Sequence, residues 1–167
     1  MRIHEMTDEE CREALAGKNV ARLACAFNNQ PYVVPIHLDL EGQFLYGYAT
    51  LGQKIEWMRQ NPLVCVEVDE LTAHGGWVSV IVIGRYEELP NAPQYQDLRR
   101  TAERLFQRHP MWWEPAAVPL THHEQRTPVV FRIRMDRVTG RRAASGAGIG
   151  ERPRPSRPRG LAALARR

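Results

Sequence analysis

Residues 77–87 read WVSVIVIGRYE and are the most strand-like stretch of the chain. All but one of the residues at 78–83 are β-branched, and β-branched side chains favour the extended backbone of a sheet. The preceding segment, residues 63–68, reads LVCVEV and alternates between two sets of side chains, as a strand with two different faces does. The two segments predict consecutive strands separated by a loop at 71–76.

Three more strand-like segments precede these, at residues 19–27, 31–40 and 43–49. Asn28-Asn29 and Glu41-Gly42 separate them, and such short polar connections are typical of tight turns. Residues 19–49 therefore predict two hairpins in succession, which form an antiparallel meander.

Two short helices are expected around these strands. Thr7 and Glu10 have the spacing of a capping box, and Gly17 is a typical end for the helix that they begin. A second helix is expected over residues 52–61, because Pro62 cannot continue it.

A longer helix over residues 93–109 and a last strand over 128–138 complete the expected order. Six strands joined mainly by hairpins, with only peripheral helices, favour a β-barrel or sandwich over a βαβ nucleotide fold. The fold class is therefore mainly β. A chain of 167 residues fits one domain, which we place at residues 1–140.

Residues 141–167 differ in composition, with eight arginines, one acid and many prolines and glycines. They cannot bury an apolar face, so we expect a disordered tail. The whole chain carries a net charge of +4, which leaves −3 on residues 1–140, and nucleic acid is not an expected partner of such a domain. The acidic amino terminus and the lack of a long apolar run predict a cytoplasmic protein with no membrane contact.

The start of the 52–61 helix has the features of an anion site. The Thr50 hydroxyl and the backbone around Gly52 precede a helix start, where unpaired amides favour a phosphate. Lys54 lies in the first turn, an unfavourable place for a cation that has no bound anion. The alternative is a solvated lysine on an amphipathic helix, and the spacing alone does not separate the two.

Four motifs in this order resemble the pyridoxamine-phosphate-oxidase-like flavoproteins of the split β-barrel superfamily, and most nearly their nitroimidazole-resistance-type branch. The motifs are PYVVPIH at 31–37, GQK at 52–54 followed by a helix ending in NP, WVSVIVIGR at 77–85, and FRI at 131–133 with TGR at 139–141. The resemblance covers residues 6–142 and implies a six-stranded antiparallel split barrel that binds FMN.

The resemblance assigns Thr50 and Lys54 to the FMN phosphate. Gln53 stands where relatives usually have an arginine, so one phosphate contact is expected to be weaker here. Ser79 matches a position that reaches the flavin in the oxidases, where a glutamine is usual.

The resemblance also implies that Pro35, Ile36 and His37 run beside the isoalloxazine ring. His37 then bonds flavin or substrate, or is a satisfied residue of the barrel wall. In this fold FMN lies at a homodimer interface, which implies that Trp113, or its neighbour Trp112, covers a flavin site in the partner subunit. The alternative is that these rings pack in the core of their own chain.

The expected function is an FMN-dependent oxidoreductase that passes electrons from a reduced nicotinamide to a small acceptor, with nitroaromatics as one candidate. The flavin supplies the chemistry, so no catalytic side chain is assigned. The alternative is a barrel that binds a flavin or haem without turnover. By the same resemblance, the true pyridoxamine-phosphate oxidases end with a segment rich in Arg, Trp and Leu that binds the substrate phosphate. The sequence after Val130 has no match to that segment, so a pyridoxine-phosphate substrate is disfavoured.

No metal site is expected. Adjacent residues of a strand point to opposite sides, so His122-His123-Glu124 favours a solvated turn over a metal-ligand set. The three cysteines, Cys11, Cys25 and Cys65, are expected to be structural thiols.

Overall fold

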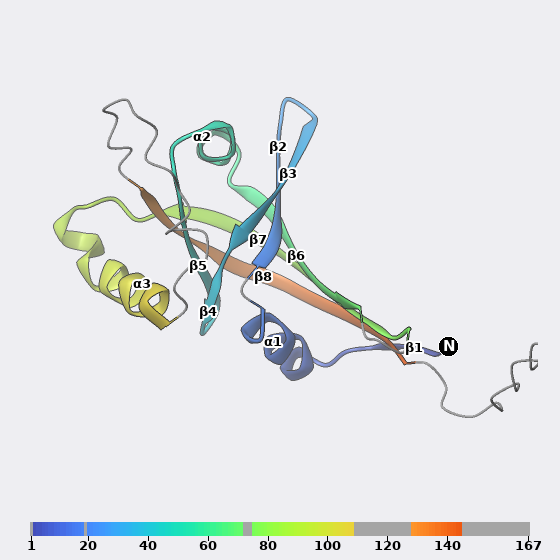
Figure 1. Cartoon of the computed structure of the whole chain (residues 1–167). Helices are drawn as coiled ribbons and strands as arrows, with labels where there is room; N and C mark the ends of the chain where they lie inside the picture. Colours follow the sequence, from blue (N-terminus) through green and yellow to red (C-terminus); the bar gives the residue numbers. More distant parts are fainter. Residues whose placement is uncertain (1, 19, 72–74, 109–127, 145–167) are drawn as a thin grey trace, which may run out of the picture.

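The computed structural model describes residues 2–18, 20–71, 75–108 and 128–144. Within these ranges eight strands form one antiparallel sheet (Figure 1). The strands are β1 (Arg2–Glu5), β2 (Val20–Phe27), β3 (Gln30–His37), β4 (Asp39–Glu41), β5 (Phe44–Ala49), β6 (Leu63–Leu71), β7 (Trp77–Glu88) and β8 (Val129–Ala144). The helices are α1 (Asp8–Ala16), α2 (Gln53–Gln60) and α3 (Gln96–Arg108), the last preceded by a 3-10 turn at Pro93–Tyr95.

The sheet follows the order β3-β2-β6-β7-β8-β5-β4, with β1 paired to β8 outside this path. It curls into an open split barrel, which confirms the fold class predicted from the sequence, with eight strands in place of the predicted six. The β2–β3 hairpin turns through Asn28 and Asn29, both with positive φ, as a tight two-residue hairpin requires.

The predicted strand over 31–40 is wrong in one respect, because the chain leaves the first edge of the sheet at Leu38. Its first part, β3, pairs with β2, whereas its second part, β4, pairs with β5. Strands β3 and β4 therefore stand at opposite ends of the strand order. The expected meander becomes two hairpins on the two edges of an open barrel.

Strand β8 is longer than the sequence predicts, because it continues to Ala144 and pairs there with β1. Residues 141–144 are thus part of the sheet, while the rest of the expected tail lies outside the described residues. An irregularity in the β7–β8 register leaves Asp136 as an extra residue, with Met135 opposite Gly84 and Arg137 opposite Ile83. A β-bulge of this kind changes which side chains of a strand face the core.

The core lies on one face of the sheet, which we call the inner face. Helices α1 and α2 cover it, and its nearly solvent-free side chains include Leu23, Ile55, Met58, Val66, Val80, Val82, Phe131 and Ile133. Helix α1 begins with the predicted capping box of Thr7 and Glu10. It packs so closely on β8 that a Cβ on Gly140 would lie 2.5 Å from Cys11 Sγ.

A second, smaller cluster lies where α3 packs beside β5 (Figure 1). Its apolar stripe is the one that the sequence predicts, and it contributes Leu98, Ala102, Leu105 and Phe106. Arg104 Nη2 also pairs with Glu41 Oε1 of β4 at 2.9 Å. The helix therefore attaches to the β4 edge of the sheet by both apolar and ionic contacts.

Candidate functional site

The start of α2 is the place that the sequence predicts for a phosphate. Thr50 and Gln53 are exposed there, and Lys54 is half-buried. Gly52 occupies the N-cap position and, without a side chain, adds no cap hydrogen bond of its own. The amides of the first helical turn and the Lys54 ammonium are therefore the groups that an anion would meet.

Aromatic packing holds α2 against the β2–β3 hairpin. The Trp57 ring lies 5.7 Å from the Tyr32 ring and 6.2 Å from the Phe27 ring, measured between centroids. Asn61 Nδ2 donates to the Ala26 carbonyl at 2.9 Å just after the helix. These contacts fix the direction in which the helix start points.

An ion pair ties the same helix to β7. The Arg59 guanidinium donates two hydrogen bonds of 2.8 Å to the two carboxylate oxygens of Glu88. This bidentate contact holds the pKa of Glu88 below its ordinary value, against the opposing effect of partial burial. Helix α2 is thus held by Trp57 against the β2–β3 hairpin and by Arg59 against β7.

The Lys54 ammonium acts on the Cys25 thiol of β2. Burial raises the pKa of this thiol, and the positive charge of Lys54 works in the opposite direction. Cys25 belongs to the core on the inner face. Helix α2 contacts β2 and contributes Ile55 and Met58 to the same core, so the start of the helix lies on the inner side of this strand.

The end of β3 carries the residues predicted to run beside a flavin ring. Pro35 is exposed, whereas Ile36 and His37 are buried. His37 Nε2 lies 2.9 Å from Asp39 Oδ2, and these side chains are 5% and 7% exposed. His37 ends β3 and Asp39 begins β4. Residues two apart on an extended chain share a side, so the two side chains meet across Leu38. The buried carboxylate fixes the orientation of the imidazole.

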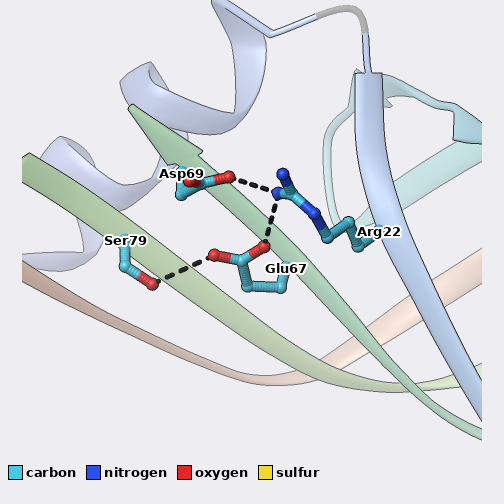
Figure 2. Close-up of polar contacts among 4 residues, drawn as sticks. All are labelled: Arg22, Glu67, Asp69 and Ser79. Atoms are coloured by element: carbon cyan, nitrogen blue, oxygen red, sulfur yellow. Dashed lines mark hydrogen bonds and ion pairs between the residues drawn. The ribbon is translucent and has the colours of Figure 1, made fainter. Parts of the chain in front are cut away.

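Ser79 lies on the other face of the sheet, which we call the outer face. Its hydroxyl donates to Glu67 Oε1 at 3.3 Å, as Figure 2 shows. Arg22 lies between Glu67 and Asp69 and pairs with both carboxylates. The hydrogen bonds to Asp69 and Glu67 raise the pKa of Arg22 further above its ordinary value. Ser79 is thus beside a polar cluster that β2, β6 and β7 share.

The structure separates Ser79 from the α2 end of the sheet. Cys25, close to Lys54, pairs with Val64, and Val64 pairs with Gly84 of β7. Ser79 is five residues from Gly84 along β7, a distance of about 16 Å at the usual rise of a strand. It also points to the opposite face. One protomer does not bring Lys54 and Ser79 into a common site.

A pocket beside Ser79 is not predicted from the sequence. This outer pocket has a volume of about 640 Å³, and its lining includes Glu5, Trp77, Ser79, Ile81, Thr139 and Arg141. The sequence does not predict that Arg141 lies in the sheet, because the composition of residues 141–167 is typical of a disordered tail. The alternation of Thr139 and Arg141 around Gly140 is the sequence signal that indicates two outward side chains on a strand.

Some predicted residues lie outside the described part of the chain, namely Trp112, Trp113 and His122-His123-Glu124. Among the described residues, no three His, Cys, Asp or Glu side chains are grouped closely enough to hold a metal ion. No helix within the described ranges is long and apolar enough to cross a membrane.

Two proteins are similar to this chain along nearly all of their own length. An uncharacterised protein of Rhizobium meliloti (strain 1021) is 40% identical over 149 residues, which cover 87% of this chain and 99% of the relative. The crystal structure of an FAD-binding protein from Mesorhizobium loti is also 40% identical, with a TM-score of 0.73 over 87% of this chain and 99% of that one.

A more distant structure shares the fold. A candidate 5-nitroimidazole antibiotic resistance protein from Bacteroides thetaiotaomicron is 18% identical, with a TM-score of 0.62 over 85% of this chain and 89% of that one. The sequence profile described as pyridoxamine 5'-phosphate oxidase matches residues 7–142. That match takes in the α2 start, the β7 strand with Ser79 and the TGR motif of β8, so the chain belongs to the pyridoxamine 5'-phosphate oxidase family.

Proposed function

We propose that this protein is a flavin-dependent oxidoreductase that binds FMN and passes electrons from a reduced nicotinamide to a small acceptor, such as a nitroaromatic. The observation that carries the proposal is the start of α2. Its first turn combines a glycine cap, the nearby Thr50 hydroxyl and the half-buried Lys54, a donor set that fits a phosphate. Family membership makes a flavin the matching phosphate-bearing cofactor.

The flavin site is formed by two subunits in this proposal. Ser79 lies about 16 Å along β7 from Gly84, the position level with Cys25 near the α2 start, and it points to the opposite face, so we place its contact with the flavin in a second copy of the chain. The outer face offers a surface for that copy. Its apolar side chains include Val20 (49% exposed), Val33 (57%), Leu63 (49%) and Ile81 (41%).

The protein's own residues bind and orient the cofactor. When bound, the flavin supplies the redox chemistry. Lys54 and the first amides of α2 hold its phosphate, and Ser79 of the partner chain contacts its ring. The buried His37–Asp39 pair keeps the end of β3 in a fixed geometry beside the ring.

FAD is the second candidate cofactor, because the Mesorhizobium loti structure with 40% identity is described as an FAD-binding protein. The phosphate at the start of α2 would then be one of two. The redox function would be the same.

Two measurements test the proposed function. The cofactor is released by denaturing the purified protein and identified by chromatography and mass, with FMN as the expected result. Oxidation of NADH and NADPH is then followed with and without an added nitroaromatic, and acceptor-dependent turnover is expected. A bound flavin without turnover would reduce the function to binding, and a protein that neither carries nor binds a flavin would refute the proposal.

A further inference from the structure

The outer pocket contains a guanidinium, Arg141, that makes no ion pair within the described part of the chain. On β7, Ser79 pairs with Asp69 on one side and with Arg141 on the other. Asp69 and Glu67 both pair with Arg22. Among the described residues, no carboxylate forms an ion pair with Arg141, although it is exposed beside the pocket. Glu5 lies opposite Arg141 on β1 and also lines the pocket, but no ion pair joins the two, so the guanidinium can donate to a bound anion.

The same pocket has an aromatic side chain and two hydroxyls. Trp77 is half-buried in the lining, and no ring of the described residues stacks on it. Ser79 and Thr139 add hydroxyls on the same face as Arg141, because these side chains alternate outward on β7 and β8. An indole is a platform for a nucleobase, and hydroxyls suit sugar and phosphate oxygens.

We propose that the outer pocket binds an adenine nucleotide. The base lies on Trp77, the phosphate contacts Arg141, and Thr139 bonds the sugar or phosphate. The Glu5 carboxylate, opposite Arg141, accepts from a sugar hydroxyl. The volume of about 640 Å³ is within the range of roughly 300–1,000 Å³ that small-molecule sites usually have.

The nucleotide has two possible sources, and this step rests on the proposed function. Ser79 belongs both to the outer pocket and to the predicted edge of the flavin ring. A dinucleotide with its adenylate in this pocket would therefore place its other end near the ring, which favours the reduced nicotinamide donor. The adenylate half of FAD is the other source.

The test is calorimetric titration of AMP into the full-length protein, with Arg141→Gln compared with Arg137→Gln. Arg137 lies on the same strand and face but does not line the pocket, so it is a matched control. Arg141→Gln should weaken AMP binding about 10- to 100-fold, the usual effect of losing a hydrogen bond to a charged group. Adenosine, which lacks the phosphate, should bind both variants equally, and Trp77→Leu should weaken both ligands.

The two sources give different results. If the donor is the source, AMP binds while the flavin is in place, and Arg141→Gln raises the KM for NADH or NADPH at unchanged flavin content. If FAD is the source, AMP binds only after flavin removal, and Arg141→Gln lowers the affinity for FAD but not for FMN.

The inference is overturned if AMP binds neither form of the protein, or if Arg141→Gln and Arg137→Gln bind it equally. Thermal unfolding of each variant shows that the fold is intact. A protein that binds AMP through Arg141 but neither carries a flavin nor oxidises a nicotinamide would keep the pocket and refute the proposed function.

Discussion

The inner and outer faces of the sheet are built from alternate residues of the same strands, yet their environments differ completely. On β6, Val64, Val66 and Val68 are buried in the core. Their neighbours Leu63 and Glu67 point outward, where they meet solvent and the Arg22 cluster. On β6 the inner set belongs to the core and the outer set is available to partners and ligands, whereas α3 covers the outer side of β5. Substitutions on the outer face should therefore change assembly and binding while the fold survives.

The largest effect is expected from a charge on the outer face. Val33 is 57% exposed in one chain, so Val33→Asp should leave the folded protomer intact. In the proposed dimer the two-fold symmetry buries two unpaired carboxylates, each costing about 3–5 kcal/mol. Size-exclusion chromatography with light scattering should show a dimer for the wild type and a monomer with little flavin for the variant. A wild type that is already monomeric would refute the two-subunit site.

A substitution on the inner side should instead lower stability. Trp57→Ala removes the contacts with Phe27 and Tyr32 that hold α2, and truncation of a large aromatic side chain costs about 3 kcal/mol. Urea unfolding should show this loss in the apo-protein as well as in the loaded protein. A loss of flavin affinity at unchanged stability would mean that Trp57 belongs to the binding site rather than to the helix support.

Lys54→Ala tests the binding function of the α2 start without disturbing the core. If the ammonium contacts the FMN phosphate, the variant should bind FMN about 1.5–3 kcal/mol more weakly. Riboflavin lacks the phosphate, so its affinity should stay the same. Fluorescence titration of both ligands measures the difference. Equal losses for the two would show that Lys54 acts through the structure of the helix.

The smallest effect is expected from the ion pair between Arg59 and Glu88. The pKa of Glu88 is lowered in the folded state, so its contribution is present above the ordinary pKa of about 4.5 and is lost as the pH falls through the folded value. Glu88→Gln should thus reduce stability by at most about 1 kcal/mol near pH 7. The difference from wild type should shrink progressively as the pH falls below that ordinary value, which urea unfolding at several pH values would measure. A difference independent of pH would assign the effect to packing.

The sequence predicts the strands and helices well where the periodicity is regular. It fails at residues 36–39, four buried residues in a row, because the two-residue alternation disappears where the chain crosses between the edges of the barrel. It also misses β1, whose residues are all exposed and give no apolar pattern. Tertiary pairing with β8, not local preference, makes Arg2–Glu5 a strand.

The site is predicted residue by residue but not as a geometry. The motifs identify Lys54 and Ser79, while their separation depends on the register of β2, β6 and β7, which no local pattern specifies. The His37–Asp39 pair has a sequence signal, since residues two apart in a strand share a side. Arg141 is missed because the composition of residues 141–167 predicts a tail, although its alternation with Thr139 around Gly140 is typical of a strand.

The extra residue in β8 determines the parity of everything that follows it. Before the bulge, the odd-numbered Phe131, Ile133 and Met135 face the core; after it, the even-numbered Val138 and Gly140 do. If Asp136 were instead paired in a regular ladder, the strand would keep its first phase. Thr139 would then take the place opposite Val80 that Gly140 needs beside Cys11, and Arg141 would turn toward the core. Deletion of Asp136 would straighten the ladder and leave each later side chain on its present face. With Asp136 present, one unpaired residue therefore keeps the second half of the strand in register with its core.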